Sequence, residues 1–290
     1  MGSKVQQPER YNKPAKLFFT LAFSWSLAFW LATVFLGGIE QVPGSLLFYV
    51  AGAGPIFAAL AVVHLGEEPL VQRSFWRRTF DPRLMSWNWL LVALIAHPLL
   101  VAFAVTIDVL MGAEIQLRRN DLTSLWSWLG LIAFVFVFGP LPEEMAWRGV
   151  ALDRMQIAMT PMMASLVLGT AWAVWHVPLF CIEGTFQHQL GIGSTRFWIF
   201  LGTMLPVSVI MTWVYNNTGR SILSAVLVHF SGNLCGTLLF KTYQLAALEL
   251  TTLTIAAVLI WLRWRDLGFS VQENIDPERP LFAEAPKSPS

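Results

Sequence analysis

Two adjacent carboxylates and an arginine interrupt an otherwise apolar stretch, at Glu143, Glu144 and Arg148. Residues four apart share one face of a helix, so we predict that Glu144 pairs with Arg148. Glu143 then points about 100° away and is free to face a cavity. A carboxylate in a partly dry site has an adjustable proton affinity, which makes Glu143 a candidate general base. The alternative is that all three residues cap the inner end of a membrane span at the water interface.

Two further apolar runs carry polar side chains. His176 lies inside one run, and His229 and Asn233 lie four residues apart in another, hence on one face of one helix. Ionisable residues at membrane depth are costly, so each is a functional-site hypothesis. The alternatives are that His176 is a hydrogen-bonded packing residue, and that the second pair makes an interhelical contact helped by Gly232 and Gly236.

Together these side chains are the parts needed for hydrolysis of an amide by water. Glu143 supplies a base, His176 a second proton-transfer group, and His229 and Asn233 two donors for an oxyanion. The sequence has neither a G-x-S-x-G nor an H-E-x-x-H motif, so the serine-hydrolase elbow and the common zinc-peptidase signature are both absent. We therefore predict a site without a cofactor. Zinc held by Glu143, His176 and His229 is the alternative.

The remaining histidines and the other carboxylate pair are interpreted as structural or incidental. Glu67 and Glu68 are followed by a proline and lack an arginine one helical turn later. His97 has no charged partner at helical spacing, and His64 and His188 stand outside any comparable cluster.

The elements that must position these residues are membrane helices. The chain has 290 residues, of which 56% are apolar and 13% charged, a composition far from that of soluble domains. Stretches long enough to cross a bilayer lie near 17–37, 44–66, 87–111, 128–157, 161–182, 197–217, 221–240 and 244–262. This predicts an all-α, polytopic transmembrane bundle of about eight spans, with a kink where Gly139 and two prolines interrupt the fourth.

The distribution of lysine and arginine predicts the orientation of the chain. With the amino terminus in the cytoplasm, the outer side carries only Arg118, Arg119, Arg196 and Lys241 of the 19 basic residues. This asymmetry follows the positive-inside rule and predicts that both termini are cytoplasmic, in the cytoplasmic (plasma) membrane. The net charge of +1 gives no field for nucleic acid. The expected partners are membrane lipids and a peptide or lipidated protein substrate.

The expected organisation is a cytoplasmic segment at 1–16, a transmembrane domain at 17–265 and a flexible tail at 266–290 that is rich in Pro, Glu and Ser. The loop at 66–86 is either an interfacial helix or a solvated loop. Because Glu143 falls toward the inner end of its span, we expect a cavity that is entered from the cytoplasm.

Three of these motifs, in order, resemble those of the CPBP family of intramembrane peptidases, also known as the CAAX-protease and bacteriocin-processing family. Its E-E-x-x-x-R element matches 143–148, and its H-x-x-x-N element matches 229–233. Its F-x-x-x-H element resembles 172–176, with Trp172 in place of the usual phenylalanine. The resemblance covers about 126–240, which marks the expected peptidase core.

The resemblance implies a glutamate-type endopeptidase, although the family was long described as metal-dependent. Glu143 and His176 would activate water, His229 and Asn233 would form the oxyanion site, and Glu144 and Arg148 would support them. Family members cleave prenylated CAAX proteins or process bacteriocin-like peptides. The alternatives are a scaffold or immunity protein that does not cleave, and a transporter that relays protons.

Overall fold

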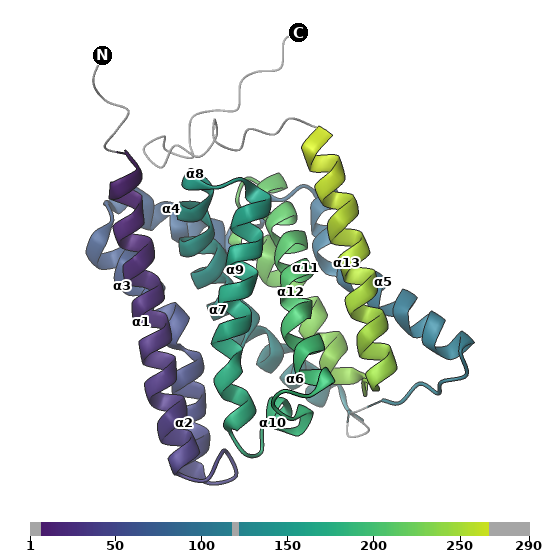
Figure 1. The fold of residues 1–290 in the computed structure, drawn as a ribbon. Coiled ribbons are helices and arrows are strands. Elements are labelled where there is room, and N and C mark those ends of the chain that lie inside the picture. The colour runs from purple at the N-terminus through teal and green to yellow at the C-terminus, as the bar shows by residue number, and fades with distance from the viewer. Residues whose placement is uncertain (1–6, 118–121, 267–290) are drawn as a thin grey trace.

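The computed structural model describes residues 7–117 and 122–266, whose regular structure is helical (Figure 1). The α-helices are α1 (Gln7–Phe35), α2 (Val42–Gly52), α3 (Gly54–Gly66), α4 (Pro69–Phe80), α5 (Trp87–Leu110), α6 (Leu125–Val137), α7 (Pro140–Ala146), α8 (Asp153–Ala158), α9 (Pro161–His176), α10 (Phe186–Leu190), α11 (Thr195–Asn217), α12 (Ile222–Leu238) and α13 (Tyr243–Asp266). The predicted all-α fold is confirmed. The predicted tail from 267 onward and residues 1–6 lie outside the described part of the chain.

Six helical stretches are long and apolar enough to cross a membrane, and the bent pair α2–α3 makes a seventh if it is counted as one span. The six are Pro14–Phe35, Trp87–Leu110, Leu125–Ala158, Pro161–Cys181, Thr195–Asn217 and Tyr243–Arg263. The expected span at 221–240 corresponds to α12, which is apolar but shorter than these six. The chain is a multi-pass membrane protein, and the count of eight spans stays a prediction.

Proline and small polar residues set many of the helix ends. Proline occupies the first turn of α2, α3, α4, α7 and α9, where its missing N–H costs nothing. The side chains of Ser124, Thr160, Ser194 and Ser221 accept hydrogen bonds from the first turns of α6, α9, α11 and α12. The predicted break in the fourth span is present, since α6 ends at Val137 and α7 begins at Pro140.

Between α7 and α8 the span adopts a π-helix, Trp147–Leu152, whose six residues are all buried. Gly149 has no room for a side chain, because a Cβ there would lie 2.9 Å from both Phe75 and Ile222. A π-helical turn inside an α-helix is rare and often marks a functional site. Here it lies one turn beyond the pair of glutamates.

Figure 1 shows a single bundle in which α1, α2 and α3 lie on one side, α5 and α13 lie on the other, and α9, α11 and α12 run between them. The helix α1 begins, and α13 ends, at the end of the bundle that also carries α4 and α8, which we call the terminal end. The short helix α10 lies at the opposite end, which we call the α10 end. The largest interfaces join α9 with α11, α1 with α3, and α11 with α13.

A buried polar cluster holds the terminal end together. Arg78 of α4 donates to Asp153 of α8 at 2.9 Å, and Tyr215 of α11 donates to the same carboxylate at 2.7 Å. Arg220, beyond the end of α11, completes the cluster with a second ion pair to Asp153. Two structures were expected for residues 66–86, a helix and a solvated loop. The segment contains the helix α4, and its Arg78 is buried.

Candidate active site

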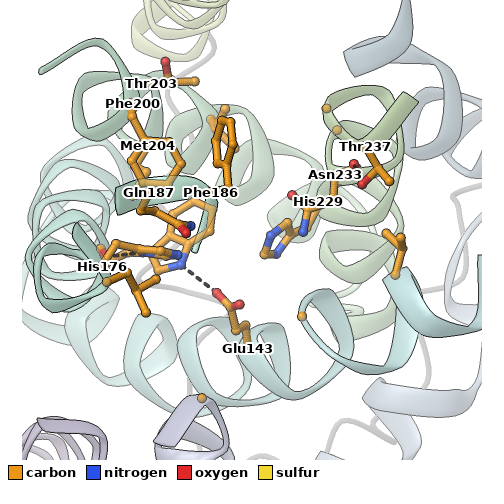
Figure 2. Close-up of a pocket in the computed structure, with 18 of the residues that line it drawn as sticks. Glu143, His176, Phe186, Gln187, Phe200, Thr203, Met204, His229, Asn233 and Thr237 are labelled. Carbon is orange, nitrogen blue, oxygen red and sulfur yellow. Dashed lines mark hydrogen bonds between the residues drawn. The ribbon is translucent and has the colours of Figure 1, made fainter. Parts of the chain in front are cut away.

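A cavity of about 880 Å³ lies in the half of the bundle nearer the α10 end. It is lined by side chains of α7, α9, α11, α12 and neighbouring helices. Figure 2 shows Glu143 below the centre of the cavity, with His176 on one side and His229 and Asn233 on the other. The structure thus brings together the four side chains predicted to do chemistry, although they come from three different helices.

Glu143 is fixed in the cavity by an indole. The Nε1 of Trp172 donates to the Oε2 of Glu143 at 2.7 Å, joining α9 to α7. The other oxygen, Oε1, lies 3.9 Å from the point where a Cβ on Gly139 would stand, and the Nδ2 of Asn233 lies 3.4 Å from the same point. Because Gly139 has no side chain, the carboxylate of Glu143 and the amide of Asn233 approach one another beside it.

Glu144 faces the protein interior instead. The Nη1 of Arg148 lies 2.8 Å from its Oε2, and the Nδ1 of His229 lies 2.8 Å from its Oε1. Arg148 also donates to the hydroxyl of Ser208 on α11. Glu144 and Arg148 are both 0% exposed. The predicted pairing is present, and the helical stretch that carries both residues continues beyond them to Ala158.

The hydrogen-bond partners assign different roles to the two histidines. The Nδ1 of His176 lies 2.8 Å from the carbonyl oxygen of Trp172, which only accepts, so this nitrogen carries the proton. In the neutral ring Nε2 is then a free acceptor. The Nδ1 of His229 donates to the carboxylate of Glu144, so its Nε2 would become a second donor whenever the ring takes up a proton. His176 therefore suits proton acceptance and His229 suits donation.

Trp172 is the contact shared by these groups. Its ring lies 5.7 Å from that of His176 and 5.1 Å from that of His229, and the guanidinium of Arg148 stands 5.6 Å from its centroid. The sequence marks this residue only as an aromatic substitution within a motif. Its donor role toward Glu143 becomes visible once α7 and α9 are placed side by side.

Asn233 presents an amide with no hydrogen-bond partner among the described residues, and it is exposed to the cavity. It stands one helical turn after His229 on α12, so both side chains reach the cavity from the same helix face. An unengaged amide donor beside a carboxylate and two imidazoles is an arrangement suited to a substrate carbonyl.

Comparison with known proteins agrees with this geometry. Residues 125–235 match the family model described as Type II CAAX prenyl endopeptidase Rce1-like. Over these residues the chain is similar to that family. The match spans α6 to most of α12 and so contains every side chain described above. The chain is also similar to CAAX prenyl protease 2 of Methanococcus maripaludis, with 24% identity over 263 residues that cover 89% of this chain and 97% of the relative. The family is thus one of proteases, as the motifs predict.

In this protein, the zinc alternative finds no ready ligand set among the described residues. Among the described residues, no three His, Cys, Asp or Glu side chains are placed so that they could hold a metal ion. That statement includes Glu143, His176 and His229. Each of these groups is instead oriented by a protein partner. Both cysteines, Cys181 and Cys235, are free thiols.

One histidine interpreted as incidental has a charged partner after all. The Nε2 of His97 on α5 lies 3.7 Å from the Oε1 of Glu249 on α13, and His97 lines the cavity. Its ring fills the space beside Gly232, where a Cβ would lie 2.5 Å from the imidazole. No sequence pattern indicates this contact, because the two partners are on helices far apart in the chain. His188, by contrast, bonds to the carbonyl of Phe180, in keeping with a structural role.

The position of the cavity differs from expectation. Its lining extends from Glu143 to Phe186 on α10, Arg196 at the start of α11, and Lys241 before α13, all at the α10 end. Both described chain ends lie at the opposite end. If the termini are cytoplasmic, this end of the cavity faces away from the cytoplasm. Glu143 lies near the middle of the stretch Leu125–Ala158, with α8 still to follow.

Proposed function

We propose that the protein is an intramembrane endopeptidase that uses water activated by Glu143 and His176 to cleave a membrane-associated or prenylated substrate. The observation that carries the proposal is that two proton acceptors and two hydrogen-bond donors, drawn from α7, α9 and α12, surround one cavity. The family description and the name of the archaeal relative both refer to CAAX prenyl proteases, which supports a prenylated peptide as the substrate class.

In the proposed reaction, a water molecule binds between Glu143 and the Nε2 of His176. Glu143 takes a proton as the water oxygen attacks the scissile carbonyl carbon. The carbonyl oxygen gains negative charge and accepts hydrogen bonds from the amide of Asn233 and the Nε2–H of His229. Glu143 then returns the proton to the departing amine as the C–N bond breaks. Glu144 and Arg148 take no part in the proton transfers and hold His229 in place.

We further propose eight spans with both termini in the cytoplasm, and location in the plasma membrane. The basic residues at 73, 77, 78, 83, 154, 220 and 263 belong to α4, α8 and neighbouring segments of the terminal end, in support of this orientation. The cavity then extends toward the outer face, so the substrate reaches it from that face or from within the bilayer. No cofactor and no nucleic acid partner is part of the proposal.

The deciding experiment compares peptide termini in host membranes that carry the native protein with those that carry Glu143→Gln. This change keeps the size of the side chain but removes its proton-accepting charge. We expect termini that are produced by the native protein and absent with the variant, because general-base catalysis contributes on the order of 10²–10⁴-fold to such reactions. Glu68→Gln, at an exposed position outside the cavity, is the matched control and should leave the profile unchanged.

Identical profiles for the native protein and Glu143→Gln, at matched expression, would contradict proteolysis. They would favour a membrane scaffold or immunity protein that binds its partner through the same cavity. The new termini, when they are found, also identify the substrate and show whether the cleaved bond adjoins a lipidated cysteine.

A further inference from the structure

The helix α4 has two faces of different character. One face, with Phe75, Arg78 and Thr79, is buried against the bundle. The opposite face borders an open pocket that lies outside the cavity of the candidate active site, and we call it the α4 pocket. Its lining combines arginines with apolar side chains and one carboxylate, and includes Leu70, Arg73, Arg77, Phe80, Asp81 and Arg83. Nothing in the proposed peptidase reaction uses this surface.

The α4 pocket lies where the bundle meets the membrane surface. The helix α4 connects α3, which ends at Gly66, with α5, which begins at Trp87, and it lies at the terminal end of the bundle (Figure 1). With 12 residues it is too short to cross a bilayer. Leu70 and Phe80 are 62% and 57% exposed although both are apolar. Apolar side chains among arginines on one exposed face are typical of a helix that lies in the interface.

The α4 pocket carries more positive charge than its own carboxylate balances. The Nε of Arg77 lies 3.3 Å from the Oδ2 of Asp81, and the Nε of Arg83 lies 2.9 Å from the Oδ1 of the same carboxylate. Asp81 therefore holds these two guanidinium groups at one place, and the side chain of Arg83 is still 88% exposed. Arg73, one helical turn before Arg77, is exposed and has no ion pair with any described residue. Three arginines thus surround a single carboxylate.

We propose that the α4 pocket binds the phosphate headgroup of an anionic phospholipid in the leaflet at the terminal end of the bundle. The negative charge of the phosphate matches the excess of arginine, and a guanidinium binds phosphate oxygens through two parallel hydrogen bonds. Leu70 and Phe80 contact the acyl chains, and a free phosphate gains nothing from them. Basic pockets beside membrane helices on the cytoplasmic side bind anionic headgroups by the same attraction. The proposal does not depend on the proposed peptidase function.

The test counts the lipids that bind to the full-length protein in a neutral detergent, by native mass spectrometry. The protein is titrated with phosphatidylglycerol or with phosphatidylcholine of the same acyl chains, so that the headgroup is the only difference. We expect the first phosphatidylglycerol to bind on the order of tenfold more tightly, since each arginine near a membrane surface raises the affinity for anionic lipid roughly fivefold. Equal binding of the two lipids would overturn the proposal and favour a soluble acidic protein as the partner of these arginines.

Matched substitutions locate the lipid. Arg73→Gln and Arg263→Gln each remove one exposed arginine from the terminal end, but only Arg73 lines the α4 pocket. Arg73→Gln should lower the preference for phosphatidylglycerol roughly fivefold, and the addition of Arg83→Gln should remove most of what remains. Arg263→Gln should leave the preference unchanged. Thermal unfolding in the same detergent verifies that each variant is folded. A preference that is equal in all of these proteins would place the lipid elsewhere and refute the α4 pocket.

Inorganic phosphate distinguishes a lipid from a soluble anion. Phosphate at the concentration of the lipid, with chloride at equal ionic strength as the control, should leave phosphatidylglycerol bound, because it cannot replace the acyl-chain contacts of Leu70 and Phe80. Displacement of the lipid by phosphate would assign the α4 pocket to a soluble anion and overturn the lipid assignment. The measurement requires no turnover. The same preference is therefore expected of Glu143→Gln, whatever the outcome for peptide cleavage.

Discussion

At the scale of single residues, the indole of Trp172 connects the groups that the proposed mechanism needs. It donates to Glu143, contacts the rings of His176 and His229 edge to face, and stands beneath Arg148. Phenylalanine, usual at this position in the resembling motif, would preserve the ring contacts but has no donor. Trp172 is thus a positioning residue for the carboxylate.

Trp172→Phe should therefore fold normally and lower kcat by about tenfold, since a hydrogen bond to a charged group is worth roughly 1.5–3 kcal/mol. The value of KM should change little, because the indole contacts the enzyme's own carboxylate. Steady-state kinetics on a prenylated peptide provide the measurement. Trp126→Phe, at a side chain that is 80% exposed, is the control. An unchanged kcat would show that the indole does not position Glu143 for the reaction.

Asn233→Ala tests the proposed oxyanion site. Loss of one oxyanion donor should lower kcat by about 10²–10³-fold, with a smaller effect on KM, because the hydrogen bond strengthens as charge develops. The protein should remain stable, since the amide makes no hydrogen bond to another described residue. Kinetics together with thermal unfolding in detergent measure both. Full activity in the variant would remove Asn233 from the mechanism.

The residue scale is also where the sequence was most informative. The pairing of Glu144 with Arg148 and the shared face of His229 and Asn233 depend on spacing within one helix, which helical geometry fixes. The hydrogen bond between His229 and Glu144 crosses 85 residues, and no local pattern specifies it. The roles of the four cavity side chains stay predictions until they are tested by substitution.

At the scale of elements, α12 is held between two neighbours that meet its functional face. On one side Gly139, at the start of α7, leaves space for Asn233, and on the other the ring of His97 on α5 occupies the space beside Gly232. The two glycine-dependent contacts fix the depth and rotation of α12. They therefore set where His229 and Asn233 stand in the cavity.

Gly232→Ala should for this reason disturb the site more than its size suggests. The new Cβ would lie 2.5 Å from the imidazole of His97, so either the ring or α12 must move. We expect a loss of about 1–3 kcal/mol in the free energy of unfolding and a clear fall in kcat. Gly236→Ala is the matched change on the same helix, where the nearest atom is 3.7 Å away, and it should be better tolerated. Equal stability of the two variants would contradict the tight contact.

The membrane helices were largely predictable from the sequence, but the irregular turns within them were predictable only in part. Apolar runs located the membrane helices, and Gly139 with its prolines located the break between α6 and α7. The π-helix at Trp147–Leu152 had no recognisable signal, because it depends on how Phe75 and Ile222 pack against Gly149. The partners of His97 were missed for the same reason, since contacts between distant helices depend on the packing of the bundle.

At the scale of the whole molecule, the cavity and the described chain ends lie at opposite ends of the bundle. The apolar pattern of the sequence stops at the glutamates, although the buried helix continues beyond them. The helical stretch continues to Ala158 because its later polar side chains are buried against partners in the protein, namely Arg148, Asp153 and Gln156. Hydropathy alone cannot show charges that are neutralised in the interior.

Labelling with a thiol reagent that does not cross membranes tests the proposed orientation. In a background in which Cys181 and Cys235 are replaced by alanine, Ile192→Cys should be labelled in intact cells, because it is exposed at the α10 end. Arg73→Cys, exposed on α4 at the terminal end, should be labelled only after the cells are broken open. The reverse pattern would place the cavity end in the cytoplasm and overturn the orientation.

The buried ion pairs also have an order in time. As the chain is synthesised from its amino terminus, Arg148 follows Glu144 by a single helical turn, so both partners of this pair enter with the same span. Asp153 emerges when Arg78 has already been made, and Glu249 emerges after both His97 and Lys241. Each of these carboxylates therefore has at least one cationic or imidazole partner that is made before it or within one helical turn after it. The pairs that stabilise the finished bundle therefore also lower the cost of inserting it, one helix at a time.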